Sequence, residues 1–333
     1  MDKNTLIETV SRMVVSPKGI LAIDEGLKTC DSRFVKLSVP TTEEKRREYR
    51  ELLVTAPEIE KYISGYILFD ETIRQSTKNE KSFVSILQRK GIEVGAKVDQ
   101  GLVDFPLHEG EKITQGLEGL SEKIKEYKGM GATFAKWRAV YTIGENTPSV
   151  DCMKENAVLL AKYASLCQEQ NIVPIVEPEI LIDGDHSIEK CFEVTAQNFD
   201  ILFAELLNQN VFISGIVLKT SMVIPGKNAK EKSTAEDIAK MTIKCLEEHV
   251  PAHIGGIVFL SGGQSDEEAT VNLNAMHKMG PLPWPLTFSY GRAIQNKALE
   301  SWAKNGEDVA AAQTLLVSAA KNNSEASIGK YEK

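Results

Sequence analysis

The sequence lacks the patterns typical of metal sites and disulfide frameworks. Its five cysteines are scattered, odd in number and form no CxxC pair: Cys30, Cys152, Cys167, Cys191 and Cys245. We interpret them as reduced, packed thiols of a cytosolic protein. The five histidines show no HExxH or similar spacing, and the DGDH segment at 183–186 is more typical of a turn than of a metal site. We therefore expect no metal.

Signals for a membrane, secretion or nucleic acid are also missing. No apolar run approaches the roughly 20 residues that span a bilayer. The first 14 residues lack a cationic stretch followed by an apolar core, so they indicate an amphipathic helix rather than a secretory signal. The net charge of −8 argues against nucleic acid or an anionic membrane as a general partner. We expect a cytoplasmic protein with neither partner.

No low-complexity stretch or linker divides the 333 residues, and no strand leads into a GxGxxG turn. Strand-like runs recur about 30 to 45 residues apart with helical segments between them, which is the spacing of βα units. These runs are Gly19–Asp24, Ile63–Asp70, Ile92–Asp99, Ala132–Arg138, Ile172–Ile180, Ile213–Lys219, Ile254–Gly262 and Leu286–Gly291. They predict one domain over residues 1–333, a single parallel (β/α)8 TIM barrel. An open doubly wound sheet is the alternative.

Helix-start signals lie between these runs. Outer helices are expected over residues 150–170 and 187–208. Three pairs have the spacing of capping boxes: Thr41 with Glu44, Ser233 with Glu236, and Ser265 with Glu268.

Charged residues end most of the predicted strands. In a barrel of this kind the working residues lie at the C-terminal strand ends, and residues two apart point to the same side. Charged side chains that simply reach solvent at the strand ends are the alternative. That alternative explains poorly why acids and bases end so many of the strands. The residues are Asp24, Asp70, Lys97, Asp99, Lys136, Arg138, Glu177, Glu179 and Lys219.

Lys219 interrupts the apolar run of the sixth strand, in the segment GIVLKTSMVIPG. Burial disfavours the charged ammonium, and a neutral amine can attack a ketone to form a Schiff base. A lysine that reaches solvent from the strand end is the alternative, and this stretch alone favours that alternative.

Glycine-rich loops follow the last two strands. Glycines let backbone N–H groups approach an anion, and the loops after strands seven and eight are the usual phosphate site of this architecture. The residues proposed for this pocket are Ser261, Gly262, Ser289, Gly291 and Arg292.

A second anion site is expected across the mouth of the barrel. Lys97 and Arg138 end other strands, and Thr29 can donate from the first loop. Cations on two sides fit a substrate with a phosphate at each end, with the reactive centre between them near Lys219.

These residues resemble a known family over nearly the whole chain, the class I fructose-1,6-bisphosphate aldolases in their compact bacterial form. The segments that carry the resemblance, in order, are KGILAIDE, YISGYILFDET, GAKVDQG, FAKWRAV, PIVEPEIL with DGDH, VLKTSMVIPG, FLSGGQSDEEA and SYGRA. The resemblance implies a metal-independent aldolase of the glycolytic and gluconeogenic reaction. It cleaves fructose 1,6-bisphosphate to dihydroxyacetone phosphate and glyceraldehyde 3-phosphate, without a cofactor and as a homotetramer.

The resemblance also implies a role for each matching residue. Lys219 is similar to the Schiff-base lysine and Glu177 to the general acid/base, with Lys136 beside it. Asp24 resembles the base for the carbon-4 hydroxyl, and Glu179 resembles a residue that orients neighbouring lysines. The two glycine-rich loops with Arg292 match the carbon-1 phosphate pocket, and Lys97 with Arg138 matches the distal one.

Three departures from the family pattern stand out. Gly26 replaces a serine, Thr220-Ser221 replaces Pro-Asn, and the chain ends two residues after Tyr331. Proton transfer to the enamine is therefore expected from Glu177 or water rather than from a terminal tyrosine. Two rival functions are a transaldolase-like enzyme on another phosphosugar and a barrel that binds without catalysis. The second predicts loss of a catalytic residue, and none is lost.

Overall fold

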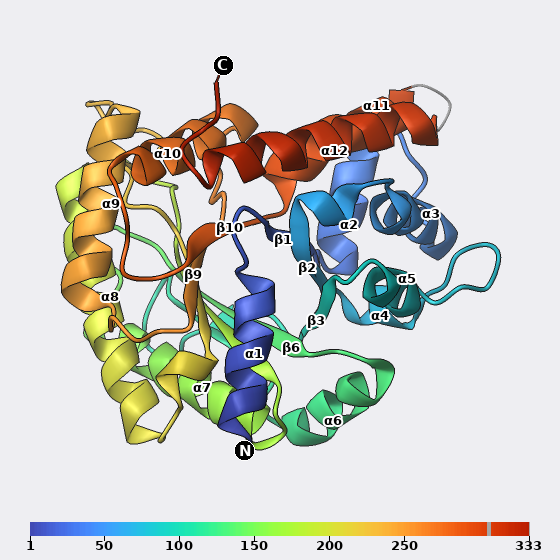
Figure 1. Cartoon of the computed structure of the whole chain (residues 1–333). Coiled ribbons are helices and arrows are strands. Elements are labelled where there is room, and N and C mark those ends of the chain that lie inside the picture. Colours follow the sequence, from blue (N-terminus) through green and yellow to red (C-terminus); the bar gives the residue numbers. More distant parts are fainter. Residues whose placement is uncertain (305–307, 333) are drawn as a thin grey trace.

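Eight parallel strands form a closed barrel in the order β1-β10-β9-β8-β7-β6-β3-β2 (Figure 1). The computed structural model describes residues 1–304 and 308–332. The predicted (β/α)8 barrel is therefore confirmed, and the alternative of an open sheet is wrong. The strands are β1 (Gly19–Ile23), β2 (Ile63–Leu68), β3 (Glu93–Lys97), β6 (Phe134–Tyr141), β7 (Val173–Ile180), β8 (Val217–Thr220), β9 (Gly256–Phe259) and β10 (Leu286–Tyr290).

Helices surround the barrel, as expected from the alternating pattern (Figure 1). The two long outer helices predicted over 150–170 and 187–208 are α7 and α8. The helices are α1 (Lys3–Met13), α2 (Leu27–Lys36), α3 (Glu43–Thr55), α4 (Asp70–Arg74), α5 (Phe83–Arg89), α6 (Leu120–Met130), α7 (Val150–Glu169), α8 (Ile188–Asn208), α9 (Ala235–His249), α10 (Asp266–Lys278), α11 (Arg292–Lys304) and α12 (Val309–Ala326), with the short 3-10 helices η1 (Ile59–Lys61) and η2 (Ile213–Gly215).

The amphipathic N-terminal helix α1 covers the N-terminal end of the barrel and lies in front of the strands in Figure 1. Its buried residues Leu6, Val10 and Met13 pack in one cluster with residues near the starts of the strands, such as Ile20 and Val173. The apolar face predicted for this helix thus covers the N-terminal end, and the C-terminal end stays open for a site.

The buried cluster inside the barrel is mostly aliphatic, and its one buried aromatic ring, that of Phe134, needs a small neighbour. A Cβ atom on Gly95 of β3 would lie 2.1 Å from the ring of Phe134 on β6. Because real Cβ atoms do not approach that closely, only glycine permits this ring to fill the space.

The structure departs from the prediction in a few local details. Residues 213–215 form η2 rather than strand, so β8 begins at Val217. Two caps lie one residue further along than predicted, at Thr42 and Thr234, whereas Ser265 caps α10 as predicted. The antiparallel hairpin of β4 (Leu102–Asp104) and β5 (Lys112–Thr114) was not predicted.

Candidate active site

One cavity of about 670 Å³ opens at the C-terminal end of the barrel, and all the residues to which the sequence assigned a catalytic or substrate-binding role line it, whereas the strand-end acids Asp70 and Asp99 do not. The strands position these side chains because residues two apart on one strand face the same side. The lining residues of that set are Asp24, Thr29, Lys97, Lys136, Arg138, Glu177, Glu179, Lys219, Ser261, Gly262, Ser289, Gly291 and Arg292.

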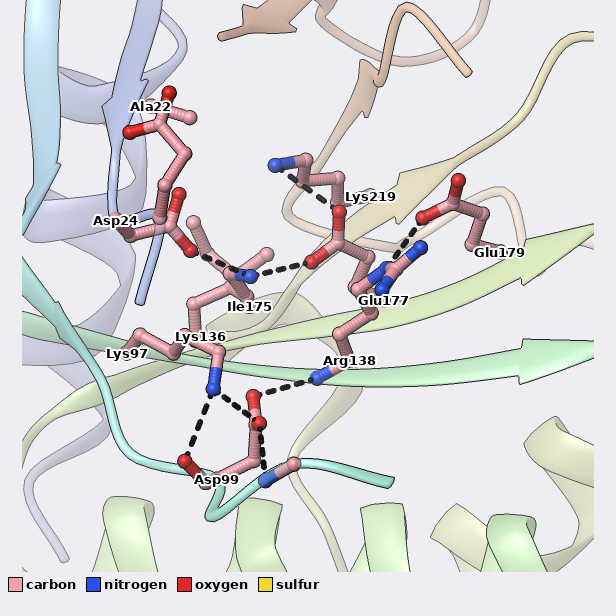
Figure 2. Close-up of polar contacts among 12 residues, drawn as sticks. Ala22, Asp24, Lys97, Asp99, Lys136, Arg138, Ile175, Glu177, Glu179 and Lys219 are labelled. Carbon is pink, nitrogen blue, oxygen red and sulfur yellow. Dashed lines mark hydrogen bonds and ion pairs between the residues drawn. The ribbon is translucent and has the colours of Figure 1, made fainter. Parts of the chain in front are cut away.

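Four side chains, the buried Lys136, Glu177 and Lys219 and the partly buried Asp24, form an alternating chain of charges at the centre (Figure 2). Lys136 Nζ lies 2.6 Å from Asp24 Oδ2 and 2.9 Å from Glu177 Oε2, and Lys219 Nζ lies 3.1 Å from Glu177 Oε1. Lys136, Glu177 and Lys219 are 3%, 3% and 4% exposed. Two carboxylates and two ammonium groups balance one another, which makes their burial tolerable.

This pairing shifts the proton affinities of the central groups. Burial alone would raise the pKa of Asp24, but the charges of Lys136 and Lys219 outweigh it and lower that pKa to about 2. Burial likewise acts against the charged form of Glu177, and the same two lysines nevertheless lower its pKa. Lys136 shows the converse: burial lowers its pKa, yet Asp24 and Glu177 raise it above the ordinary value. Asp24 and Glu177 are therefore ionised and Lys136 is charged near neutral pH.

Lys219 points into the cavity rather than into solvent, so the solvated strand end is wrong for this residue. Its ammonium nitrogen faces a carboxylate instead of purely apolar surroundings. The stretch around Lys219, which by itself favoured a lysine that reaches solvent, therefore predicted neither its burial nor its carboxylate partner.

The glycine-rich loops have the geometry of an anion pocket. Gly262 and Gly263 adopt φ values of +53° and +86°, which side chains rarely allow. The Ser289 hydroxyl is buried and has no hydrogen-bond partner among the described residues. Arg292 opens α11 and is exposed at the cavity, and within the described residues it forms no ion pair. The first N–H groups of a helix also lack partners inside the helix.

The two cations on the other side of the mouth, Lys97 and Arg138, already have carboxylate partners in the protein. Arg138 Nε donates to Glu179 Oε2 at 2.5 Å, and Lys97 Nζ donates to the carboxylate of Asp99. Thr29 lies exposed in the first turn of α2. Lys97 and Arg138 can therefore bind an anion only if each shares its charge between its protein carboxylate and the ligand.

Asp70 does not belong to this site, so its place among the functional strand ends was wrong. It begins α4, accepts hydrogen bonds from Tyr127 at 2.6 Å and Arg74 at 2.9 Å, and does not line the cavity. The strand β2 ends at Leu68, two residues earlier than predicted, because Phe69 caps a new helix.

Two basic residues of the cavity were not predicted from the sequence. Arg33 and Lys36 of α2 line it, and Arg33 is paired with Glu25. Residues three or four apart share a helix face, so the spacing from Thr29 to Arg33 and on to Lys36 was a usable signal.

The departures from the family pattern have clear places in the structure. Gly26 caps α2 without any side-chain hydrogen bond. Thr220 ends β8, and the Ser221 hydroxyl donates to the Ile180 carbonyl at 2.9 Å, which ties the end of β8 to that of β7. Tyr331 packs against the core on the outside and does not line the mouth.

The structure also bears on the metal sites, membrane spans and cysteines considered in the sequence. Within residues 1–304 and 308–332, no group of three or more metal-binding side chains is placed to hold an ion. The described part of the chain also contains no helix long and apolar enough to cross a membrane. All five cysteines are free and buried.

Fold and site together define a β/α-barrel enzyme whose strand ends gather lysines and carboxylates in one cavity. The family model for class I fructose-bisphosphate aldolase matches residues 5–333. A probable class 1 fructose-bisphosphate aldolase of Xanthomonas campestris pv. campestris is 50% identical over 333 residues, 100% of both chains. A cytosolic fructose-bisphosphate aldolase of Arabidopsis thaliana is 48% identical over 98% of this chain and 84% of its own.

A solved structure agrees with these relatives. Fructose-bisphosphate aldolase from Plasmodium falciparum, crystallised with TRAP and a small-molecule inhibitor, superposes with a TM-score of 0.98. It is 45% identical and covers 99% of this chain and 96% of its own. The chain belongs to the class I fructose-bisphosphate aldolase family.

Proposed function

We propose that this chain reversibly cleaves fructose 1,6-bisphosphate through a Schiff base on Lys219. The observation that carries the proposal is the central chain of charges, in which Lys219 Nζ lies 3.1 Å from Glu177 Oε1 and Lys136 joins Glu177 to Asp24. The class I family, to which the chain belongs, supports both the reaction and its covalent route.

The first step is attack of the neutral Lys219 amine on the ketone carbon. Before this attack, the Lys219 ammonium gives one proton to Glu177, which is ionised in the free protein. After the attack, a second proton of the amine nitrogen passes to the ketone oxygen and completes the carbinolamine. Glu177 then gives its proton to the carbinolamine hydroxyl, which leaves as water, and an iminium forms. One carboxylate serves as base and then as acid because the step returns its proton.

Cleavage follows when Asp24 takes the proton of the carbon-4 hydroxyl. The bond between carbons 3 and 4 breaks, its electron pair moves to the iminium to form an enamine, and glyceraldehyde 3-phosphate leaves. A pKa of about 2 makes Asp24 a weak base in the free protein, so substrate must alter its contact with Lys136. Lys136 stabilises whichever oxygen carries the negative charge.

The remaining enamine takes a proton at carbon 3 and is hydrolysed, which releases dihydroxyacetone phosphate and the free lysine. Glu177 or a bound water supplies the proton in this scheme. Glu179 holds Arg138, so we assign it an orienting role.

The two phosphates are proposed to bind on opposite sides of Lys219. The carbon-1 phosphate meets the glycine-rich loops, the Ser289 hydroxyl and Arg292, whose guanidinium can donate two parallel hydrogen bonds. The distal phosphate meets Lys97, Arg138 and Thr29, with Arg33 of α2 as a further cation. The proposal also includes a cytoplasmic location and assembly as a homotetramer. Sedimentation checks the oligomeric state.

Borohydride trapping tests the covalent step. Dihydroxyacetone phosphate and borohydride should add one reduced adduct to the peptide that contains Lys219, and Lys219→Met should abolish it. Lys227→Met is the matched control, since Lys227 lies on the following loop outside the central cavity. An adduct found only at Lys28, Lys97 or Lys136 would refute the assignment. Cleavage should persist in the presence of a chelator.

A further inference from the structure

Asp99 is a buried carboxylate at the barrel mouth that no step of the proposed reaction uses. It follows the end of β3 by two residues and is 7% exposed. It does not line the cavity, so a substrate there does not touch it. Any contribution to the reaction must therefore pass through the residues that it contacts.

Those contacts converge on the distal side of the mouth (Figure 2). Lys97 Nζ donates to the backbone carbonyl of Asp99 at 3.0 Å and also to Oδ1. The backbone N–H of Gly101 donates to Oδ1 at 3.1 Å, and that of Arg138 to Oδ2 at 3.3 Å. One carboxylate thus joins β3, β6 and the loop that leads into the hairpin.

The arrangement fixes the direction of the Lys97 ammonium. An ammonium has three N–H donors, and two of them face acceptors of Asp99. The third is left for a ligand in the cavity that Lys97 lines. A free lysine side chain has many rotamers, and ordering them on binding weakens affinity. A lysine already held in place avoids that loss.

We propose that Asp99 is a positioning residue that holds Lys97 ready for the distal phosphate. The proposal rests on the function assigned above to Lys97 and Arg138. Repulsion between Asp99 and a phosphate is limited because the carboxylate is paired with Lys97 and does not line the cavity.

Kinetics with two substrates test this inference on the full-length enzyme. Fructose 1,6-bisphosphate carries the distal phosphate, and fructose 1-phosphate lacks it. Asp99→Ala should raise KM for the bisphosphate by about tenfold, the change that corresponds to losing most of the ordering of one lysine. KM for fructose 1-phosphate should stay within about twofold. Asp99→Asn keeps one acceptor oxygen and should give a smaller rise.

Two further variants separate positioning from general damage. Asp104→Ala removes another carboxylate that pairs with a lysine, but on the exposed hairpin, and should change neither KM. In a Lys97→Met background, Asp99→Ala should add little further loss for the bisphosphate. Should Asp99→Ala fail to fold, as judged by circular dichroism, Asp99→Asn carries the same comparison.

Three results overturn the inference: an equal KM rise for both substrates, a lower KM for the bisphosphate, or an undiminished Asp99→Ala effect in the Lys97→Met background. If Lys97→Met raises KM for the bisphosphate and neither Asp99 variant does, this inference alone fails. If Lys97→Met has no effect, the distal site proposed for Lys97 fails, and the role of Asp99 fails with it.

Discussion

The ammonium nitrogen of Lys136 lies between two carboxylates, 2.6 Å from Asp24 Oδ2 and 2.9 Å from Glu177 Oε2. These acids come from β1's end and from β7, which are not neighbours in the barrel. One cation from β6 therefore keeps two acids, one buried and one partly buried, ionised and lets them serve different steps of one reaction.

Removing that cation should disable the site. Lys136→Met leaves Asp24 and Glu177 buried without their shared partner, and breaking a buried pair costs about 3–5 kcal/mol of stability. Cleavage should fall by about 10²–10⁴, the range of a lost acid/base group. Lys136→Arg keeps the charge and is the control for stability. A folded Lys136→Met enzyme with more than a tenth of normal kcat would contradict this role.

The pairing of Asp24 predicts a pH dependence of stability. Its pKa is about 2 in the folded protein against an ordinary 3.8, so the folded state favours the ionised carboxylate. This contribution is present above pH 3.8 and is lost as the pH falls through about 2. It amounts to about 2 kcal/mol at neutral pH. The free energies of unfolding of wild type and Asp24→Asn, measured in urea, should therefore converge by about that amount between about pH 5 and pH 2. A constant difference over this range counts against the shift.

Ser289 should matter to substrate and not to folding. Its buried hydroxyl has no partner among the described residues, so Ser289→Ala removes an unpaired group and should leave thermal stability equal or higher. Affinity for the carbon-1 phosphate should fall by about 1 kcal/mol, seen as a higher KM. Ser221→Ala is the matched control. That hydroxyl donates to the Ile180 carbonyl at 2.9 Å, and its loss should lower the melting temperature.

Tyr331 is not expected to carry the enamine proton. Asn274 of α10 holds its backbone with two hydrogen bonds, of 3.2 and 3.1 Å, on the outside of the barrel. Tyr331→Phe, or removal of Tyr331 to Lys333, should change turnover by less than about tenfold. Lys333 itself lies outside the described residues. Proton exchange on dihydroxyacetone phosphate, measured beside bond cleavage, is the check. Lost exchange with intact formation of the enamine would show that Tyr331 does move the proton.

The strand ends show what the sequence determined by itself. Apolar runs broken by helix-start signals predicted all eight barrel strands, since a buried parallel strand needs apolar residues on both faces. Alternation then placed Lys136 with Arg138, and Glu177 with Glu179, toward one cavity. Both predictions depend only on local chain geometry.

Tertiary structure alone decided which charges meet. Lys136 pairs with Asp24, which lies 112 positions away, because closure and stagger of the barrel bring their strand ends together. The same closure brought Arg33 of α2 to the mouth, while the start of a helix at Asp70 removed that carboxylate from it. A local pattern specifies the face on which a side chain lies. Its partner across the barrel depends on distances that only the closed sheet sets.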